Sequence, residues 1–319
     1  MLRKSAVRGL YLASIAAVAA IFAAITPAQA NIVITPTFDS TITSDPNAAT
    51  IEASINAAIS RAENLVTNNT TCSITFQEMG SGLGSSSTSH FVIPYSTYLA
   101  ALQTVQTRSA NDNTALATLP TQATNPVNGN ANVNVQTTLA RALGIVNNAG
   151  SDGTIGLKTS ICNISRTGTQ NPGFYDLQAV AGHEIDEVLG IGGPGSALPT
   201  LNGSVGPLDL FRYASNNTRS FTTSSSVNSY FSIDNGATNL VYFDQNSQGA
   251  DFADWGNGTP NATAGNTPPQ LQDSYGSPEG SPATFVNLGI NEATALDVIG
   301  YNINYAAAPE PASGALFIL

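Results

Sequence analysis

Cysteine, histidine and methionine are scarce in this sequence of 319 residues, which contains only two of each. The cysteines, Cys72 and Cys162, are far apart in the chain, which excludes a zinc site of the Cys-x-x-Cys type. At most one disulfide can form, and we expect it to form because other features of the sequence indicate export; two buried free thiols are the alternative. Two histidines also exclude a metal site built from three imidazoles.

Charged residues are rare as well, at 10% of the chain, and those of positive sign are the rarer. There are 10 Lys and Arg against 21 Asp and Glu, for a formal net charge of −11. An acidic chain of this kind is unsuited to nucleic acid, which we therefore exclude as a partner. Low charge combined with abundant Asn, Thr, Ser, Gly and Ala resembles the composition of exported bacterial proteins.

An apolar run lies near the N-terminus, over residues 9–25, and three basic residues precede it. Ala28 and Ala30 then form an Ala-x-Ala cleavage site. This order of segments predicts a secretory signal peptide over residues 1–30 and a mature chain that begins near Asn31. A membrane anchor is the alternative, but the run is short and lacks a second charged boundary. We therefore expect a secreted protein, extracellular or at the cell surface.

Residues 306–319 contain the sequence "PEPAS" at positions 309–313, followed by "GALFIL". "PEPAS" resembles the start of a PEP-CTERM sorting signal, the tag of bacterial proteins that exosortase systems process. In such a signal the motif precedes a membrane-spanning helix, but "GALFIL" cannot cross a hydrocarbon core that needs about 20 residues. We expect a truncated tag, with exosortase-type sorting machinery as a partner; a disordered Pro-rich end is the alternative.

The segment between these ends, residues 31–305, predicts one α+β domain with an N-terminal part, 31–190, and a C-terminal part, 191–305. Apolar periodicity predicts helices over 47–66, 133–145, 174–189 and 290–300, strands over 71–79, 90–95 and 153–165, and a hairpin over 230–244 with an Asn-Gly turn. The Gly/Ser-rich residues 80–89 and the polar residues 108–130 predict loops. We expect a mixed sheet with helices, a central helix that ends at Gly190, and an irregular C-terminal subdomain.

The central helix contains the sequence "AGHEIDEVLG" over residues 181–190, which differs from the His-Glu-x-x-His motif only in its last motif residue. Helical residues four positions apart share a face, so His183 and Glu187 can bind one metal ion with Glu184 beside it. Both residue types are accepted zinc ligands, and Glu184 would accept a proton from a metal-bound water as general base. An ordinary helix with a chance His-Glu pair is the alternative. Asp186 should face away from the metal, into solvent.

A third metal ligand has to come from another segment. In metzincin proteases a glycine and then a histidine follow the motif; Gly190 matches the glycine, but Gly193 occupies the position of the histidine. His90 lies far upstream, so we expect an oxygen ligand. Asp209 is the first candidate, because the loop before it is long enough to return to the helix. Such a ligand set is less selective for zinc over other divalent ions.

Several other residues of the C-terminal part have two interpretations each. Arg212 and Tyr213 either stabilise an oxyanion or pack the strand that contains them. Asp251, Asp254 and Trp255 form either a calcium-binding turn or a surface turn.

Five segments in order resemble a family of secreted bacterial metzincin-like metalloproteases often found with PEP-CTERM tags. Between residues 173 and 302 they read "HEIDEVLG", "PLDLFRYA", "YFSIDNGATNL", "DFADWGN" and "ALDVIGYN". The resemblance implies a zincin fold, a catalytic zinc and peptide hydrolysis, with His183 and Glu187 as metal ligands and Glu184 as catalytic base. The chain departs from metzincins at large because it lacks the third histidine and, with only Met1 and Met79, the methionine turn.

Two functions from different classes are compatible with these features. The first is a secreted zinc-dependent endopeptidase that hydrolyses a protein or peptide substrate with water activated by Glu184. The second is a catalytically silent cell-surface or matrix protein on a protease-like scaffold, which the missing histidines and the sorting-like tail favour. Metal content and the effect of Glu184→Gln on hydrolysis distinguish them.

Overall fold

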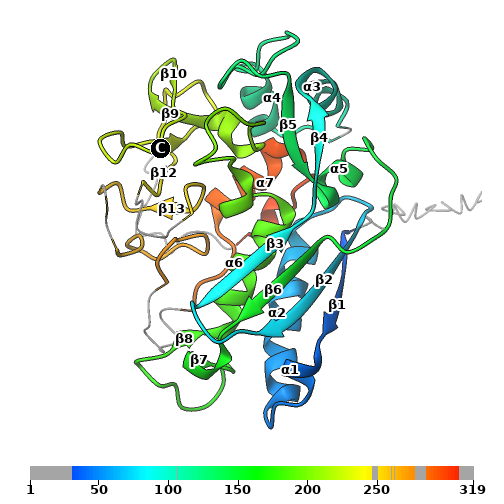
Figure 1. Cartoon of the computed structure of the whole chain (residues 1–319), viewed down its shortest axis with the longest axis vertical. Coiled ribbons are helices and arrows are strands. Elements are labelled where there is room, and N and C mark those ends of the chain that lie inside the picture. The colour runs from blue at the N-terminus through cyan, green and yellow to red at the C-terminus, as the bar shows by residue number, and fades with distance from the viewer. Residues whose placement is uncertain are drawn as a thin grey trace, which may run out of the picture.

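The computed structural model describes residues 31–105, 107–245, 251–259, 261, 263–276 and 285–308. The expected signal peptide and residues 309–319 of the expected tag lie outside this part of the chain. The fold is α+β with a mixed sheet, as the sequence predicts, and a region of short strands follows the sheet and its helices (Figure 1). Of the helices within the described residues, none is both long and apolar enough to cross a membrane.

The main sheet has four strands in the order β1-β2-β6-β3. Three of them are parallel, namely β1 (Val33–Phe38), β2 (Thr71–Glu78) and β6 (Gly153–Leu157). The fourth, β3 (Gly84–Thr88), runs antiparallel to β6 and forms an edge. The sheet therefore ends on the side of β3 with backbone groups that have no strand partner among the described residues.

Two helices, α2 (Ala48–Leu65) and α6 (Leu177–Leu189), pack against each other and lie behind the sheet in Figure 1. The sequence of β2 explains this layer, because its buried residues Cys72, Ile74 and Phe76 alternate with more exposed ones. In α2 the buried isoleucines recur every four residues and form one apolar face. The helix expected over 47–66 and the strand expected over 71–79 are confirmed.

The loop expected over residues 80–89 is wrong in its second half, where β3 forms. This strand consists of Gly, Ser and Thr, so it shows no apolar alternation that would mark a strand in the sequence. It is held by its pairing with β6 and by its packing on α6. A Cβ at Gly84 would lie 2.2 Å from Oε1 of Glu184, so this close approach of strand and helix requires glycine.

A further group of elements lies at one end of the sheet (Figure 1). Strands β4 (His90–Pro94) and β5 (Asn132–Gln136) pair antiparallel, accompanied by α3 (Tyr95–Thr104), α4 (Ala110–Leu116), α5 (Thr137–Ala142) and α7 (Ile290–Ile299). The helix expected over 133–145 is wrong at its start, where β5 forms. The loop expected over 108–130 is wrong at α4, which begins with a capping box between Ser109 and Asp112. The strand expected over 90–95 and the final helix are confirmed.

The C-terminal part contains a five-stranded antiparallel sheet in the order β10-β9-β11-β12-β13. Its strands are short: β9 (Arg212–Ser215), β10 (Thr218–Arg219), β11 (Tyr230–Phe231), β12 (Val241–Phe243) and β13 (Trp255–Gly256). The expected hairpin is confirmed, with φ of 62° at Asn235 and 83° at Gly236 in the connection. Trp255 packs on the ring of Phe231, with 5.8 Å between the ring centroids.

The expected disulfide is wrong, because Cys72 and Cys162 are both free. Cys72 lies in β2 beneath the helices, whereas Cys162 begins the short strand β7 (Cys162–Asn163), which pairs with β8 (Tyr175–Asp176). Both side chains are buried, and burial raises the pKa of each thiol to about 12. The two cysteines therefore serve as small apolar core residues.

Candidate metal centre

The central helix α6 carries His183, Glu184 and Glu187 along the floor of a cleft. The residue before the helix, Asp176, caps it: its carboxylate accepts a hydrogen bond from the first helical turn and pairs with a guanidinium nitrogen of Arg166 at 2.6 Å. It ends at Gly190, which has a φ of 115° and adopts this left-handed conformation without strain. The expected end of the helix is thus confirmed.

His183, Glu187 and Asp254 form a group of potential metal ligands, in which one ligand atom of each residue lies within 4.8 Å of the others. His183 Nε2 is 3.8 Å from Glu187 Oε1 and 3.5 Å from Asp254 Oδ2. Ligand atoms around a tetrahedral zinc ion with bonds of about 2.0 to 2.2 Å lie about 3.3 to 3.6 Å apart. The observed separations are therefore close to those of a metal site.

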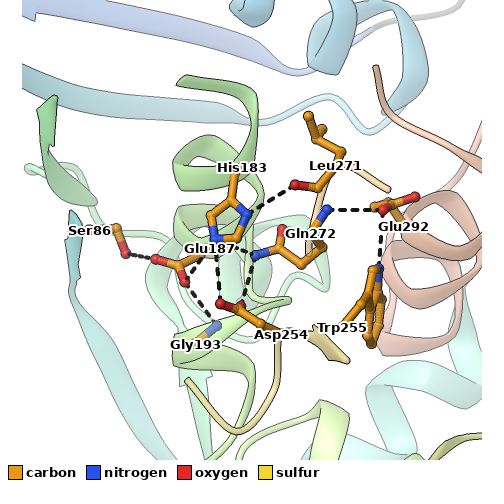
Figure 2. A network of polar contacts seen from close by, with 9 residues as sticks. All are labelled: Ser86, His183, Glu187, Gly193, Asp254, Trp255, Leu271, Gln272 and Glu292. Carbon is orange, nitrogen blue, oxygen red and sulfur yellow. Dashed lines mark hydrogen bonds and ion pairs between the residues drawn. The ribbon is translucent and has the colours of Figure 1, made fainter. Parts of the chain in front are cut away.

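The imidazole of His183 is oriented by the backbone of a distant segment, as Figure 2 shows. Its Nδ1 lies 3.0 Å from the carbonyl oxygen of Leu271, and a carbonyl can only accept a hydrogen bond, so Nδ1 carries the hydrogen. Nε2 is then the nitrogen available to a metal ion, and it lies near Glu187, Asp254 and the amide of Gln272. This is how proteins orient a histidine that binds a metal.

Both oxygens of the Glu187 carboxylate are held by hydrogen bonds (Figure 2). Ser86 Oγ of β3 donates to Oε2 at 2.5 Å, and the backbone N–H of Gly193 donates to Oε1 at 3.0 Å. A Cβ at Gly193 would lie 2.7 Å from that same oxygen. The residue at the position of the third metzincin histidine therefore supports Glu187 through its backbone.

Asp254 reaches the centre from the C-terminal part, immediately before β13. The neighbouring Trp255 donates from Nε1 to Glu292 Oε1 at 3.1 Å, and the same oxygen accepts from the backbone N–H of Gln272 at 3.1 Å (Figure 2). Glu292 Oε2 accepts from the backbone N–H of Gly289 at 3.0 Å. One buried carboxylate of α7 thus fixes the two segments that face His183 from the C-terminal part.

The electrostatics of the centre favour a cation. Burial alone would lower the pKa of His183, but the carboxylate of Asp254, followed by Glu184 and Glu187, raises it well above its ordinary value. Burial raises the pKa of Glu187 well above its ordinary value, and the neighbouring Glu184 and Asp254 add to this shift. Several carboxylates are therefore crowded around one imidazole, and a bound divalent ion would relieve their repulsion.

Glu184 lies next to this ligand group and is buried, with 5% of its surface exposed. Burial, opposed by His183, raises the pKa of its carboxyl to about 7. Its Oε2 has no hydrogen-bond partner within the described residues, although it is buried. The cleft above it has a volume of about 610 Å³ and is lined by residues 82–86 of the β3 region, by α6 and by residues 269–271 and 273–276.

Asp209 is not part of the centre, so the structure contradicts its assignment as third ligand. It is buried in a 3₁₀ turn, Leu208–Phe211, and its carboxylate accepts from Ser196 Oγ at 2.5 Å and from the backbone N–H groups of Ala197 and Gly206 at 2.8 Å each. These donors fix the loop between α6 and β9. The long loop does return toward the helix, but Asp209 holds the loop itself.

Other residues singled out in the sequence also have clear positions. Asp186 is fully buried, so the expectation that it faces solvent is wrong. The buried guanidinium of Arg212 donates from Nη1 to the carbonyl of Phe252 at 2.5 Å and lies over the ring of Phe243, which supports the packing interpretation. His90 begins β4, outside the cleft, and is exposed.

The sequence did not place two residues, Asp254 and Gln272, at the centre. Asp254 was recognised as a candidate for a calcium-binding or surface turn, but no pattern linked it to the helix. Gln272, whose amide contacts both His183 and Asp254, carried no signal in the sequence. The two consecutive glycines after the helix, Gly192 and Gly193, are the one sequence feature that relates to the centre. A Cβ at either position would collide with a side chain of the centre.

Comparison with other proteins adds no assignment. The chain matches no protein-family model, and searches of curated proteins and of solved structures gave no significant match. The fold is α+β with a mixed sheet, and the centre is a group of three residues that could bind a metal.

Proposed function

We propose that this protein is a secreted metal-dependent endopeptidase of zincin type, with zinc bound by His183, Glu187 and Asp254. The observation that carries the proposal is the convergence of these three ligands on the floor of an open cleft, with Glu184 next to them. The oriented imidazole and the doubly held Glu187 carboxylate support it, because preformed ligand geometry is typical of metal sites.

In this proposal Glu184 is the general base. A divalent ion at the centre would polarise the scissile carbonyl and lower the pKa of water. Glu184 accepts a proton from the attacking water as the new C–O bond forms, and returns it to the amine nitrogen as the C–N bond breaks. Its buried Oε2, which has no partner among the described residues, is suited to hold that proton.

The cleft suits an extended peptide. Part of its lining comes from β3, which pairs with β6 on one edge only among the described strands. An extended chain can add to such an edge through backbone hydrogen bonds, which recognise a peptide largely independently of its sequence. The edge residues Gly84, Ser85 and Ser86 line the cleft beside Glu184. Protein or peptide substrates therefore fit better than small molecules.

The test is hydrolysis of an unfolded protein by the purified chain, with and without a chelator. Glu184→Gln should lower the rate at least about 100-fold while leaving the bound metal unchanged, because the ligands are intact. Glu52→Gln makes the same chemical change on α2, outside the cleft, and should be silent. Hydrolysis that survives both the chelator and Glu184→Gln would refute the proposal.

A catalytically silent scaffold is the second candidate. It is favoured by the amide of Gln272, which lies against His183 and Asp254 where a catalytic centre would keep an open position. A protein that binds zinc stoichiometrically but hydrolyses no protein substrate would fit this candidate and contradict the first.

A further inference from the structure

The side chain of Gln272 reaches into the ligand group (Figure 2). Its Nε2 lies 3.1 Å from His183 Nε2 and 3.0 Å from Asp254 Oδ1. Both distances are hydrogen-bond distances, slightly shorter than the about 3.3 to 3.6 Å that separates ligand atoms around zinc. The amide nitrogen therefore contacts two of the three ligand residues from a position that a fourth ligand could occupy.

The other end of the same amide has no partner. Gln272 is fully buried, and its Oε1 accepts no hydrogen bond within the described residues. A buried acceptor without a donor costs about 1 to 3 kcal/mol, so a structural role alone leaves this oxygen unexplained. Half a turn about the last side-chain bond exchanges Oε1 and Nε2, which brings an oxygen to the ligand group in place of the nitrogen.

The surrounding backbone is shaped to this amide. Gly192 has a φ of 66°, and a Cβ there would lie 2.1 Å from Gln272 Nε2 and 3.0 Å from Asp254 Oδ1. The backbone of Gln272 is fixed at both ends, because its N–H donates to Glu292 and its carbonyl accepts from Trp255 N–H at 2.8 Å. The side chain is thus presented to the centre by a rigid segment.

We propose that Gln272 is a fourth, displaceable ligand of this centre, which binds the metal through Oε1 after its amide turns over. The inference rests on the proposed metal site at His183, Glu187 and Asp254. A neutral amide oxygen is held by a divalent ion less strongly than the carboxylates beside it. Gln272 therefore occupies the fourth coordination position when no other ligand is bound. It leaves that position when a small anion or a peptide carbonyl binds.

The experiment uses the cobalt(II) form of the full chain, with azide as the probe of an open metal position and visible absorption as the readout. Wild type should bind azide at least about 10-fold more weakly than Gln272→Leu, because azide must first displace the amide. Gln122→Leu is the control and should behave as wild type. It makes the same chemical change outside the cleft, where the amide of Gln122 donates to the carbonyl of Thr124 at 2.8 Å.

A second variant covers the case in which Gln272→Leu does not fold. Gln272→Glu retains an oxygen ligand and removes the amide donor. If residue 272 is a ligand, this variant should bind zinc at least as tightly as wild type and should bind azide more weakly. If the amide only donates to Asp254, the variant should bind zinc more weakly and bind azide as wild type does.

Equal azide affinity in wild type and Gln272→Leu, or weaker zinc binding in Gln272→Glu, would overturn the inference. The proposed function would still stand if Glu184→Gln abolishes chelator-sensitive hydrolysis. A wild-type chain that binds neither cobalt nor zinc would instead overturn both proposals. The metal measurements and the hydrolysis assay therefore distinguish a failure of the Gln272 inference from a failure of the proposed function.

Discussion

The N-terminal and C-terminal parts of this molecule are stabilised in different ways. From residue 31 to 190, long elements bury apolar faces, as β2 does with Ile74 and Phe76. From residue 191 onward the strands have two to four residues, and buried carboxylates bind the backbone between them. We call Asp209, Asp273 and Glu292 the carboxylate hubs, because each accepts hydrogen bonds from at least two backbone N–H groups.

The difference follows from the backbone. A long helix or sheet satisfies its own N–H and C=O groups, whereas short strands and turns leave many of these groups without regular partners. A carboxylate can accept several hydrogen bonds, so one buried side chain organises several turns. The candidate metal centre lies where the two regions meet, with His183 and Glu187 from one and Asp254 from the other.

The largest effect is expected at the hub Asp209. Asp209→Ala removes the acceptor of three donors, from the half-buried Ser196 and Ala197 and the buried Gly206, and should lower the free energy of unfolding by about 3 kcal/mol or more. Urea unfolding measures this loss. Asp209→Asn keeps the size and one oxygen and should lose less. A loss below about 1 kcal/mol for Asp209→Ala would contradict the view that buried carboxylates stabilise the C-terminal part.

A smaller effect is expected at Glu292. Glu292→Gln replaces one acceptor oxygen with an amide donor that faces N–H groups, so at least one of three hydrogen bonds is lost. We expect a loss of about 1 to 2 kcal/mol in unfolding free energy. Zinc affinity should fall about 10-fold, because the segments of Asp254 and Gln272 lose their common anchor.

Glu63→Gln is the matched control for Glu292→Gln. Glu63 also accepts from a backbone N–H, that of Ile34 at 2.8 Å, but it lies on α2 in the N-terminal part. Its replacement should leave zinc affinity unchanged. If both variants change zinc affinity equally, Glu292 does not act by fixing the ligand segments.

The smallest effect is expected at Asp112, a buried carboxyl of the N-terminal part that, within the described residues, accepts one backbone N–H, from Ser109. Burial, followed by Asp297, raises its pKa from 3.8 to about 6. The folded state therefore holds the proton more tightly than the unfolded chain. The resulting stabilisation is complete below about pH 4 and is lost as the pH rises through 6.

Asp112→Asn cannot ionise, so wild type should lose stability relative to this variant between pH 4 and 7. We expect about 1 kcal/mol, allowing for partial screening by solvent, measured by urea unfolding at several pH values. Asp45→Asn, at a half-buried position of the N-terminal part, is the control and should track wild type. A constant difference between wild type and Asp112→Asn across this range would contradict the assignment.

The same division explains which elements could be predicted from the sequence. Apolar period and turn residues identified α2, β2, α6 with its end at Gly190, and the hairpin around Asn235 and Gly236. The strand β3 could not be found in this way. Its small polar residues form a strand because β6 pairs with it and α6 supports it, and neither partner is adjacent in the sequence.

The residues of the candidate metal centre differ in the same way in how far the sequence predicts them. His183, Glu184 and Glu187 share one helix, so their spacing alone predicts that they lie together. Asp254 and Gln272 reach the centre through turns with no period, and their positions depend on hydrogen bonds to Glu292 far along the chain. Asp209 was a reasonable choice by loop length, but loop length does not reveal that three nearby donors bind this carboxylate.

The central claim is that His183, Glu187 and Asp254 bind one divalent metal ion, and zinc titration of the purified protein followed by calorimetry tests it most directly. Asp254→Asn and Asp209→Asn make the same chemical change at the third residue of the candidate ligand group and at the residue that the sequence suggests for this role. We predict one zinc per chain in wild type and in Asp209→Asn, with affinity lowered at least about 100-fold in Asp254→Asn. Unchanged zinc binding in Asp254→Asn, or no zinc binding by wild type, would contradict the account.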